Sequence, residues 1–218
     1  MIPQRYARQD ETLALMRLAP VIPVLTVQSR ADGLAQARAL VAGGLPAIEV
    51  TLRTAAALDA IRVIAAEVPG AVVGAGTVVD ETGMAAALAA GARFLVSPGA
   101  TPHLAAAAAA SPAPFLPGAA TASEAMALRE LGFRQLKFFP AEAAGGAKAL
   151  AALAAPLADL QFCPTGGIDL ARAPAYLALP NVVCVGGSWM VPKAAVAAGD
   201  YATVERLARE AAGLARPG

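Results

Sequence analysis

Short apolar runs alternate with longer amphipathic runs along most of the chain. The apolar runs are rich in valine, leucine, isoleucine and phenylalanine, which is typical of buried strands. Eight runs qualify as strands: Val21–Val27, Ala47–Leu52, Ala71–Thr77, Phe94–Pro98, Phe115–Gly118, Gln135–Phe139, Gln161–Thr165 and Val182–Gly186. The pattern therefore predicts a chain that returns repeatedly to one sheet.

The longer runs predict helices between these strands. An amphipathic helix is expected at the start, over Asp10–Leu18, and another at the end, over Tyr201–Ala215. The helices expected between strands include Asp32–Ala42, Thr54–Val68, Glu81–Ala90, Ser123–Leu131 and Gly146–Leu157. Strict alternation indicates a parallel sheet, because parallel neighbours need a crossover connection. Eight units predict an α/β fold, a (β/α)8 TIM barrel with an additional N-terminal helix, rather than an open doubly wound sheet.

Composition changes this picture little. No linker divides the chain, so a single barrel domain over residues 1–218 is expected. Hydrophobic residues make up 57% and mean hydropathy is +0.58, which raises the question of a membrane span. The longest stretch without Asp, Glu, Lys or Arg, Phe94–Ser123, is interrupted by prolines and glycines, so no spanning helix is expected there. Alanine runs such as Ala105–Ala110 account for the hydropathy and favour closely packed helices.

Charge and residue usage limit the classes of partner. The segment Met1–Asp10 lacks the apolar core of a secretory signal, which favours a cytoplasmic protein. The net charge is +1, with no basic run and 5% aromatic residues, so neither nucleic acid nor a membrane surface is expected as a partner. Cys163 and Cys184 lie in apolar runs without metal-ligand spacing and are interpreted as reduced core thiols. With a single histidine, no metal site and no cofactor are expected.

Lys137 is the first candidate for chemistry. It lies in the stretch Leu136–Glu142, among apolar strand formers, where an ammonium group is costly to bury. Desolvation disfavours the charged form of an amine, and a neutral lysine can attack a carbonyl and form a Schiff base. The alternative is a lysine at a strand end with its head in water.

Other polar residues gather where the predicted strands end, and in a parallel barrel the active site lies at these carboxyl ends. Strand alternation puts Glu49 and Arg53 on one face and Val50 with Leu52 on the other, toward the helices. A carboxylate inside the barrel favours acid/base catalysis, and arginine suits a substrate carboxylate. A surface ion pair between Glu49 and Arg53 is the alternative. Thr54 would then cap the following helix.

Two glycine pairs follow the last two predicted strands. Thr165-Gly166-Gly167 and Gly186-Gly187-Ser188 stand where barrel enzymes often bind phosphate through backbone N–H groups. Either pair alone could simply form a tight turn, but their joint position favours a phosphate site. His103 is interpreted as a solvated residue in the first turn of a helix. Trp189 is interpreted as a packing residue or a subunit contact.

Seven segments resemble the 2-dehydro-3-deoxy-6-phosphogluconate aldolase family in their order and spacing: Val41–Gly44, Glu49–Thr54, Gly74–Thr77, Ser97–Gly99, Lys137–Glu142, Cys163–Gly167 and Gly186–Trp189. The resemblance implies that Lys137 is the Schiff-base lysine and Glu49 the proton shuttle, while Arg53 and Thr77 bind the pyruvate carboxylate. The implied phosphate ligands are Thr165, Gly166, Gly167, Gly187 and Ser188. Pro98 and Phe139 are expected to form the wall of the pocket. Ala144 departs from the family, where asparagine is expected.

The resemblance implies a homotrimeric, metal-free class I aldolase of the Entner–Doudoroff pathway. It would cleave 2-dehydro-3-deoxy-6-phosphogluconate to pyruvate and glyceraldehyde 3-phosphate, and 4-hydroxy-2-oxoglutarate to pyruvate and glyoxylate as a further activity. Three alternatives stay open: an aldolase for another 2-keto-3-deoxy sugar acid, a phosphosugar isomerase or decarboxylase without a covalent lysine, and a non-catalytic phosphosugar-binding barrel.

Overall fold

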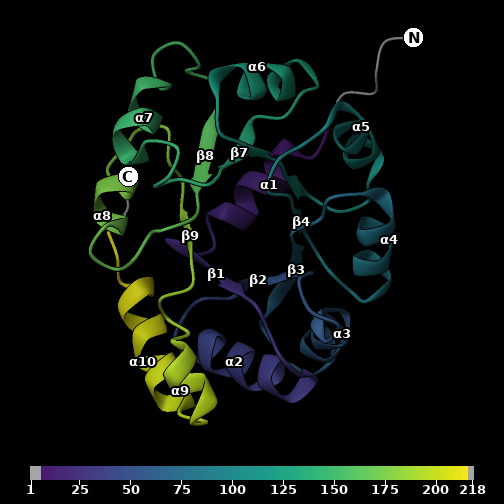
Figure 1. Ribbon diagram of the computed structural model, residues 1–218, viewed down its shortest axis with the longest axis vertical. Helices are drawn as coiled ribbons and strands as arrows, with labels where there is room; N and C mark the ends of the chain where they lie inside the picture. Colours follow the sequence, from purple (N-terminus) through teal and green to yellow (C-terminus); the bar gives the residue numbers. More distant parts are fainter. Residues whose placement is uncertain (1–5, 216–218) are drawn as a thin grey trace.

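The computed structural model describes residues 6–215, with the strands at the centre and most helices around them (Figure 1). The strands are β1 (Val21–Leu25), β2 (Ala47–Thr51), β3 (Val72–Gly76), β4 (Leu95–Val96), β5 (Phe115–Leu116), β6 (Gly118–Ala119), β7 (Gln135–Phe138), β8 (Gln161–Pro164) and β9 (Val185–Gly187). The helices are α1 (Gln9–Met16), α2 (Arg30–Ala42), α3 (Ala57–Glu67), α4 (Glu81–Ala89), α5 (Pro102–Ala110), α6 (Ala122–Glu130), α7 (Gly146–Ala152), α8 (Ala173–Leu177), α9 (Lys193–Ala197) and α10 (Tyr201–Ala212).

All strand pairs are parallel, and together they close into a ring. One sheet has the order β5-β4-β3-β2-β1-β9 and the other the order β6-β7-β8. The sheets meet at Pro117, the single residue between β5 and β6, and at isolated bridges that join Phe162 to Val182 and Thr165 to Gly186. The predicted α/β barrel is therefore confirmed. The predicted strand Phe115–Gly118 is interrupted because proline has no N–H to donate to a neighbouring strand.

Several element boundaries differ from the sequence-based prediction. β4 is shorter than predicted, and the last strand begins later, at Val185. The helix predicted from Thr54 begins at Ala57, and the prediction that Thr54 caps it is wrong. The Thr54 hydroxyl instead donates to the carbonyl of Val27 at 2.8 Å, so it ties the ends of β1 and β2 together.

Side-chain caps begin most of the longer helices, which explains where those helices start. Each cap oxygen accepts a hydrogen bond from a backbone N–H in the first turn. The capping residues are Ser29 for α2, Asp80 for α4, Thr101 for α5, Thr121 for α6 and Asp200 for α10. At α6, Glu124 also accepts from the Thr121 N–H, which completes a capping box.

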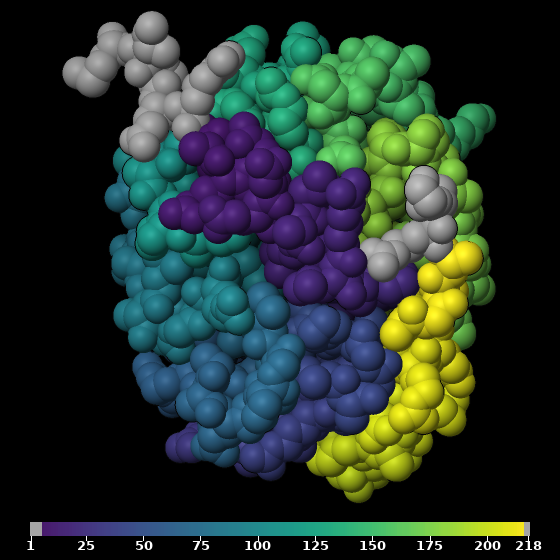
Figure 2. Space-filling model, turned by 180° about the vertical axis from the view of Figure 1, so that it is seen from behind, coloured from purple at the N-terminus to yellow at the C-terminus, as the bar shows by residue number. Residues whose placement is uncertain are grey.

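Strand alternation separates two apolar cores. Val21 belongs to the core between the strands and the helices, whereas its neighbour Ile22 belongs to a smaller core inside the barrel. The inner core contains Leu15, Met16, Ile22, Ala47, Phe94, Val96, Leu116, Cys163 and Cys184. Because Leu15 and Met16 come from α1, this helix closes the amino end of the barrel. Figure 2 shows the purple segment that contains α1 lying across the middle of that face.

The surface features expected from the sequence are partly tested. His103 is exposed, as predicted, and its Nε2 lies 3.0 Å from Glu81 Oε1. Ala105 and Ala108 of α5 are buried, which confirms the role proposed for the alanine run. Within residues 6–215, no helix is long and apolar enough to cross a membrane. The expectation about a secretory signal rests partly on Met1–Arg5, which lie outside the described residues.

Candidate active site

Lys137 of β7 and Glu49 of β2 form an ion pair inside the barrel. Lys137 Nζ lies 3.0 Å from Glu49 Oε1 and 3.3 Å from Oε2. The two residues are only 5% and 3% exposed, respectively. The alternative of a lysine with its head in water is therefore wrong. A surface ion pair between Glu49 and Arg53 is also wrong, because the Glu49 carboxylate faces inward.

The backbone opposite Glu49 leaves room for its carboxylate. Glu49 pairs in register with Val24 on one side and Gly74 on the other. A Cβ atom at Gly76, two residues farther along β3, would collide with the Glu49 side chain. Sequence reasoning did not assign this role to Gly76. The available signal was a glycine at an inward-facing position of a strand next to the strand that carries the carboxylate.

Phe139 and Pro98 lie near Lys137 at the carboxyl end of the barrel. Phe139 directly follows β7, and Pro98 lies in the loop after β4. The Phe139 ring centroid is 5.4 Å from Lys137 Nζ, within range of a cation–π contact. Gly118 pairs in register with Lys137, and a Cβ atom there would collide with the carbonyl of Pro98. Both predicted wall residues are half-buried. The geometry therefore brings one predicted wall residue to the amine and the other against the neighbouring strand.

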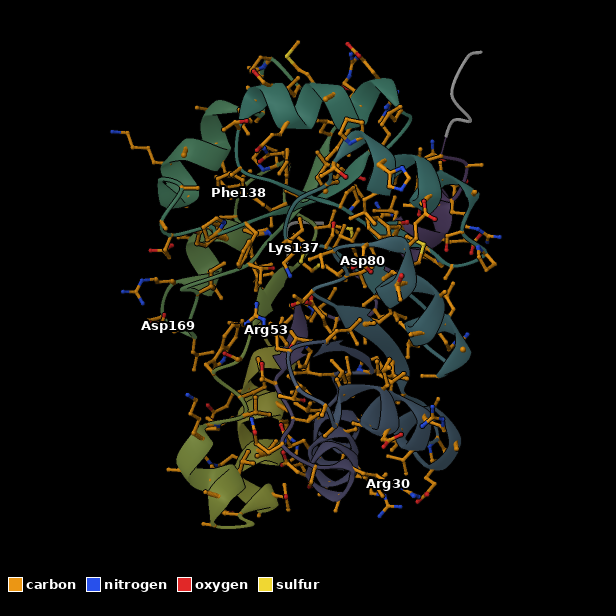
Figure 3. All side chains as sticks on the ribbon, turned by 45° about the vertical axis from the view of Figure 1, so that its right-hand side comes forward. Arg30, Arg53, Asp80, Lys137, Phe138 and Asp169 are labelled. Atoms are coloured by element: carbon orange, nitrogen blue, oxygen red, sulfur yellow. The ribbon has the colours of Figure 1, made fainter. Side chains whose placement is uncertain are left out.

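Arg53 and Thr77 lie together beyond the ends of β2 and β3. Arg53 Nε donates to Thr77 Oγ1 at 3.2 Å, and no acidic residue among residues 6–215 pairs with this exposed guanidinium. Thr77 has a φ of +59°, which is unusual for a β-branched residue and often marks a functional site. In Figure 3, Lys137 and Arg53 both lie toward the middle of the molecule, whereas Arg30 lies at its periphery.

The loop that follows Lys137 is hydrogen-bonded to Thr165-Gly166-Gly167, the first glycine loop. The N–H of Ala141 donates to Thr165 O at 2.8 Å, and the N–H of Glu142 donates to Gly166 O at 3.1 Å. Gly166 and Gly167 have φ values of +107° and +78°, a region that side chains disfavour. The glycine loop therefore has a fixed position relative to the strand that carries Lys137.

A group beside this loop was not anticipated from the sequence. The buried Tyr176 hydroxyl donates to the Glu142 carboxylate, and Arg172 Nε lies 3.5 Å from the second oxygen of that carboxylate. A Cβ atom at Gly167 would lie 2.7 Å from Glu142 Cγ. Burial, reinforced by the neighbouring carboxylate, raises the pKa of Tyr176. The only sequence signal was the place of Glu142 in the stretch that begins with Lys137.

The second glycine loop exposes a serine and packs against the tryptophan. Gly186 and Gly187 are tightly packed, since a Cβ atom would collide with Thr165 at the first and with the Trp189 ring at the second. Trp189 therefore contributes to packing, as predicted. Ser188, which lies between Gly187 and Trp189 in the chain, is exposed. Glycine is thus required here for close packing, whatever this loop binds.

The two cysteines are the remaining candidates for metal-binding chemistry. Cys163 and Cys184 are buried free thiols, as predicted. Across the described part of the chain, no group of three or more His, Cys, Asp or Glu side chains is arranged to hold a metal ion. The charged chemistry of the barrel interior therefore centres on Lys137 and Glu49.

Comparison with known proteins agrees with this geometry. Residues 13–207 match the family model described as KDPG and KHG aldolase. The 2-dehydro-3-deoxy-phosphogluconate aldolase of Pseudomonas aeruginosa is 52% identical over 95% of this chain and 93% of its own. The KHG/KDPG aldolase of Escherichia coli K12 is 50% identical over 91% of this chain and 93% of its own.

A solved structure supports the fold and the class of chemistry. The KDPG aldolase of Legionella pneumophila superposes with a TM-score of 0.90 and 41% identity, over 93% of this chain and 98% of that one. In that crystal structure pyruvate was captured at low pH as a covalent carbinolamine intermediate. The buried lysine–carboxylate pair, the closed barrel and these matches lead to one conclusion: the chain belongs to the KDPG and KHG aldolase family.

Proposed function

We propose that the protein is a class I aldolase that cleaves 2-dehydro-3-deoxy-6-phosphogluconate to pyruvate and glyceraldehyde 3-phosphate. The observation that carries this proposal is the buried contact of 3.0 Å between Lys137 Nζ and Glu49 Oε1. An amine must lose a proton before it attacks a carbonyl, and a carboxylate in contact with it is placed to accept that proton. The aldolases that are 52% and 50% identical to this chain support the same reaction.

The first half of the reaction forms the iminium. Glu49 accepts a proton from Lys137, and the neutral amine adds to the C2 ketone to give a carbinolamine. Glu49 returns the proton to the carbinolamine hydroxyl, which leaves as water and leaves a protonated imine on Lys137. Arg53 binds the C1 carboxylate beside the Thr77 hydroxyl, since its guanidinium is otherwise free to form an ion pair.

The second half breaks the carbon–carbon bond. Glu49 takes the proton of the C4 hydroxyl, the C3–C4 bond electrons move toward the iminium, and an enamine and an aldehyde result. The same carboxylate then protonates C3 of the enamine. Hydrolysis of the resulting imine releases pyruvate and regenerates Lys137. A single carboxylate suffices because each step moves one proton at nearly the same place.

The remaining site residues are assigned to the walls and the phosphate. Pro98 and Phe139 would contact the apolar faces of the substrate. The phosphate would bind to Thr165, Gly166, Gly167, Gly187 and Ser188, mainly through backbone N–H groups. The left-handed backbone of Gly166 and Gly167 supports this assignment, because glycine lets an anion approach the main chain.

The direct test is release of pyruvate from the phosphorylated keto-deoxy acid, together with reductive trapping. Borohydride with pyruvate should add one pyruvate-derived mass at Lys137. An adduct at Lys148 or Lys193 would move the site. An isomerase or decarboxylase on this barrel would turn over its substrate without any adduct, and a non-catalytic binding barrel would give neither product nor adduct.

The phosphate assignment can be tested separately. Cleavage of 4-hydroxy-2-oxoglutarate, proposed as a further activity and consistent with the name of the Escherichia coli relative, involves no phosphate. Ser188→Ala should lower kcat/KM for the phosphorylated substrate by about one to two decades, the cost of about 1.5–3 kcal/mol for a hydrogen bond to a charged group. The unphosphorylated substrate should be nearly unaffected, and the exposed Ser123→Ala serves as the control. An equal decline for both substrates would contradict the assignment. Ser188 is a cleaner probe than Gly167, where a side chain would collide with Glu142.

We also propose a single-domain homotrimer that acts in the cytoplasm. Val79 and Met126 are 59% and 50% exposed, respectively, and a subunit interface that covered them would remove this apolar surface from water. Light scattering should give three times the chain mass of 21.7 kDa. A monomer across the micromolar range would exclude the trimer.

A further inference from the structure

Two threonines form a hydrogen-bonded pair at the carboxyl ends of β1 and β2. Thr26 Oγ1 lies 3.0 Å from Thr51 Oγ1, and Thr51 Oγ1 donates to Leu25 O at 2.8 Å. A hydroxyl has one proton, and that of Thr51 is used on the Leu25 carbonyl. Thr26 is therefore the donor of the pair. Among residues 6–215, no group donates a hydrogen bond to its oxygen, so the lone pairs of that oxygen can accept hydrogen bonds from a ligand.

Thr26 presents this acceptor at the catalytic end of the barrel. On β1, Ile22 belongs to the core inside the barrel, and strand alternation places Thr26 on the same inward face. Thr51 is fully buried, whereas Thr26 is exposed. Thr51 also shares the face of Glu49, two residues earlier on β2. The two threonines thus lie closer to the carboxyl end of the barrel than the Glu49 carboxylate does, and the hydroxyl of Thr26 is the more accessible of the two.

The strand order places Thr26 between the strand that carries Glu49 and the glycine loop that contains Ser188. β1 is hydrogen-bonded to β2, which carries Glu49, and to β9, which leads to Ser188 (Figure 1). Pro23 pairs in register with Gly187, so Thr26 lies beyond the level of the second glycine loop. A substrate that extends from the carboxylate of Glu49 to a phosphate at that loop passes the end of β1.

We propose that Thr26 is a specificity-determining residue that accepts a hydrogen bond from the C5 hydroxyl of the phosphorylated substrate. This inference rests on the proposed function. There, the C4 hydroxyl contacts Glu49 and the phosphate on C6 lies at the glycine loops, which leaves the C5 hydroxyl between them. An acceptor with no proton to give selects a hydroxyl donor at this position. It therefore favours an aldehyde product that carries a hydroxyl next to its carbonyl.

The test uses the reverse reaction, addition of pyruvate to two aldehydes that differ by this hydroxyl. One is glyceraldehyde 3-phosphate and the other is 3-oxopropyl phosphate, which lacks the hydroxyl. Thr26→Val keeps the shape of the side chain and should lower kcat/KM for the first about two- to tenfold, the effect of one neutral hydrogen bond. It should leave the second unchanged, and Thr26→Ser should restore the preference.

Thr54→Val is the matched control, because it removes a threonine hydroxyl at the same end whose one hydrogen bond within residues 6–215 is to the Val27 carbonyl. The ratio of the two kcat/KM values should not change in this variant. Trapping of pyruvate by borohydride should be as complete in Thr26→Val as in the wild type, which shows that the lysine is intact. An unchanged ratio in Thr26→Val, or an equal decline with both aldehydes, would overturn the inference. If the wild type added pyruvate to neither aldehyde, the proposed function itself would be wrong.

Discussion

The two ends of the barrel are built from the same strands but have opposite chemistry. At the amino end, inward-facing Ala47 and Cys163 join an apolar core that Met16 of α1 completes. Two residues farther along the chain from each of these, Glu49 of β2 and Thr165 immediately after β8 are buried polar residues. Strand alternation thus places an apolar layer directly beneath a polar one.

This difference separates stability from reactivity. At the amino end, truncation of a buried apolar side chain should lower the free energy of unfolding because it leaves a cavity. It should not affect turnover, because these side chains do not contact the proposed catalytic pair. The carboxyl end carries a buried ion pair, whose attraction offsets the cost of desolvation but is weak evidence of stabilisation. We therefore expect substitutions at the two ends to separate cleanly into effects on folding and effects on turnover.

The largest effect is expected from Lys137→Met, which should abolish turnover because no amine remains to form the iminium. It should also destabilise the fold by about 3–5 kcal/mol, because the Glu49 carboxylate would stay buried without its cation. Turnover is measured by the release of pyruvate, and stability is measured by urea unfolding. Lys148→Met is the control at an exposed lysine. Adding Glu49→Gln to Lys137→Met should restore stability but not turnover, and full activity in either variant would exclude the Schiff-base role.

Glu49→Gln alone should lower turnover by about 10²–10⁴-fold, the usual contribution of a positioned acid/base group. Some borohydride-trapped adduct should persist, because the amine is still present. The exposed Glu67→Gln should behave as the wild type. Turnover that stayed the same in Glu49→Gln would make this carboxylate a structural partner of Lys137 only.

Met16→Ala tests the amino end. The side chain is fully buried, so its truncation should cost about 2–5 kcal/mol of unfolding free energy, measured by urea denaturation. The kcat of the folded protein should not change. Leu18→Ala, at an exposed leucine of the same end, should be close to neutral. A large fall in kcat for Met16→Ala would show that the two ends are coupled.

Glu124→Gln tests whether position at the carboxyl end is enough to affect catalysis. Hydrogen bonds from the Ala120 N–H and from Thr121 lower the pKa of Glu124 below its ordinary value of 4.5. A lowered folded pKa stabilises the protein above about pH 4.5, and this stabilisation is lost as the pH falls through the folded value. The variant should lose about 0.3–1 kcal/mol near neutral pH, with the difference from wild type vanishing in acid and kcat unchanged. Glu130→Gln, at the other end of α6, should show no such pH dependence.

Much of the fold and the site followed from local patterns. Alternation of apolar runs predicted the parallel barrel because each strand must bury both faces, and strand parity predicted that Glu49 faces inward and Val50 faces the helices. The residues around Lys137 were identified for the same reason: a charged side chain within a buried strand is unusual. The errors lay at boundaries, such as the start of α3 and the break at Pro117, where single hydrogen bonds decide the outcome.

The sequence by itself determined the strand–helix alternation, the inward face of each strand and the candidates Lys137 and Glu49. Only the tertiary structure decided that these two side chains pair with each other, because β2 and β7 are far apart in the chain and meet only when the ring closes. It also decided that Gly76 makes room for the carboxylate and that Thr51 leaves Thr26 as an acceptor. Periodicity reports the face that a residue occupies, but partners and proton directions depend on distances across the barrel.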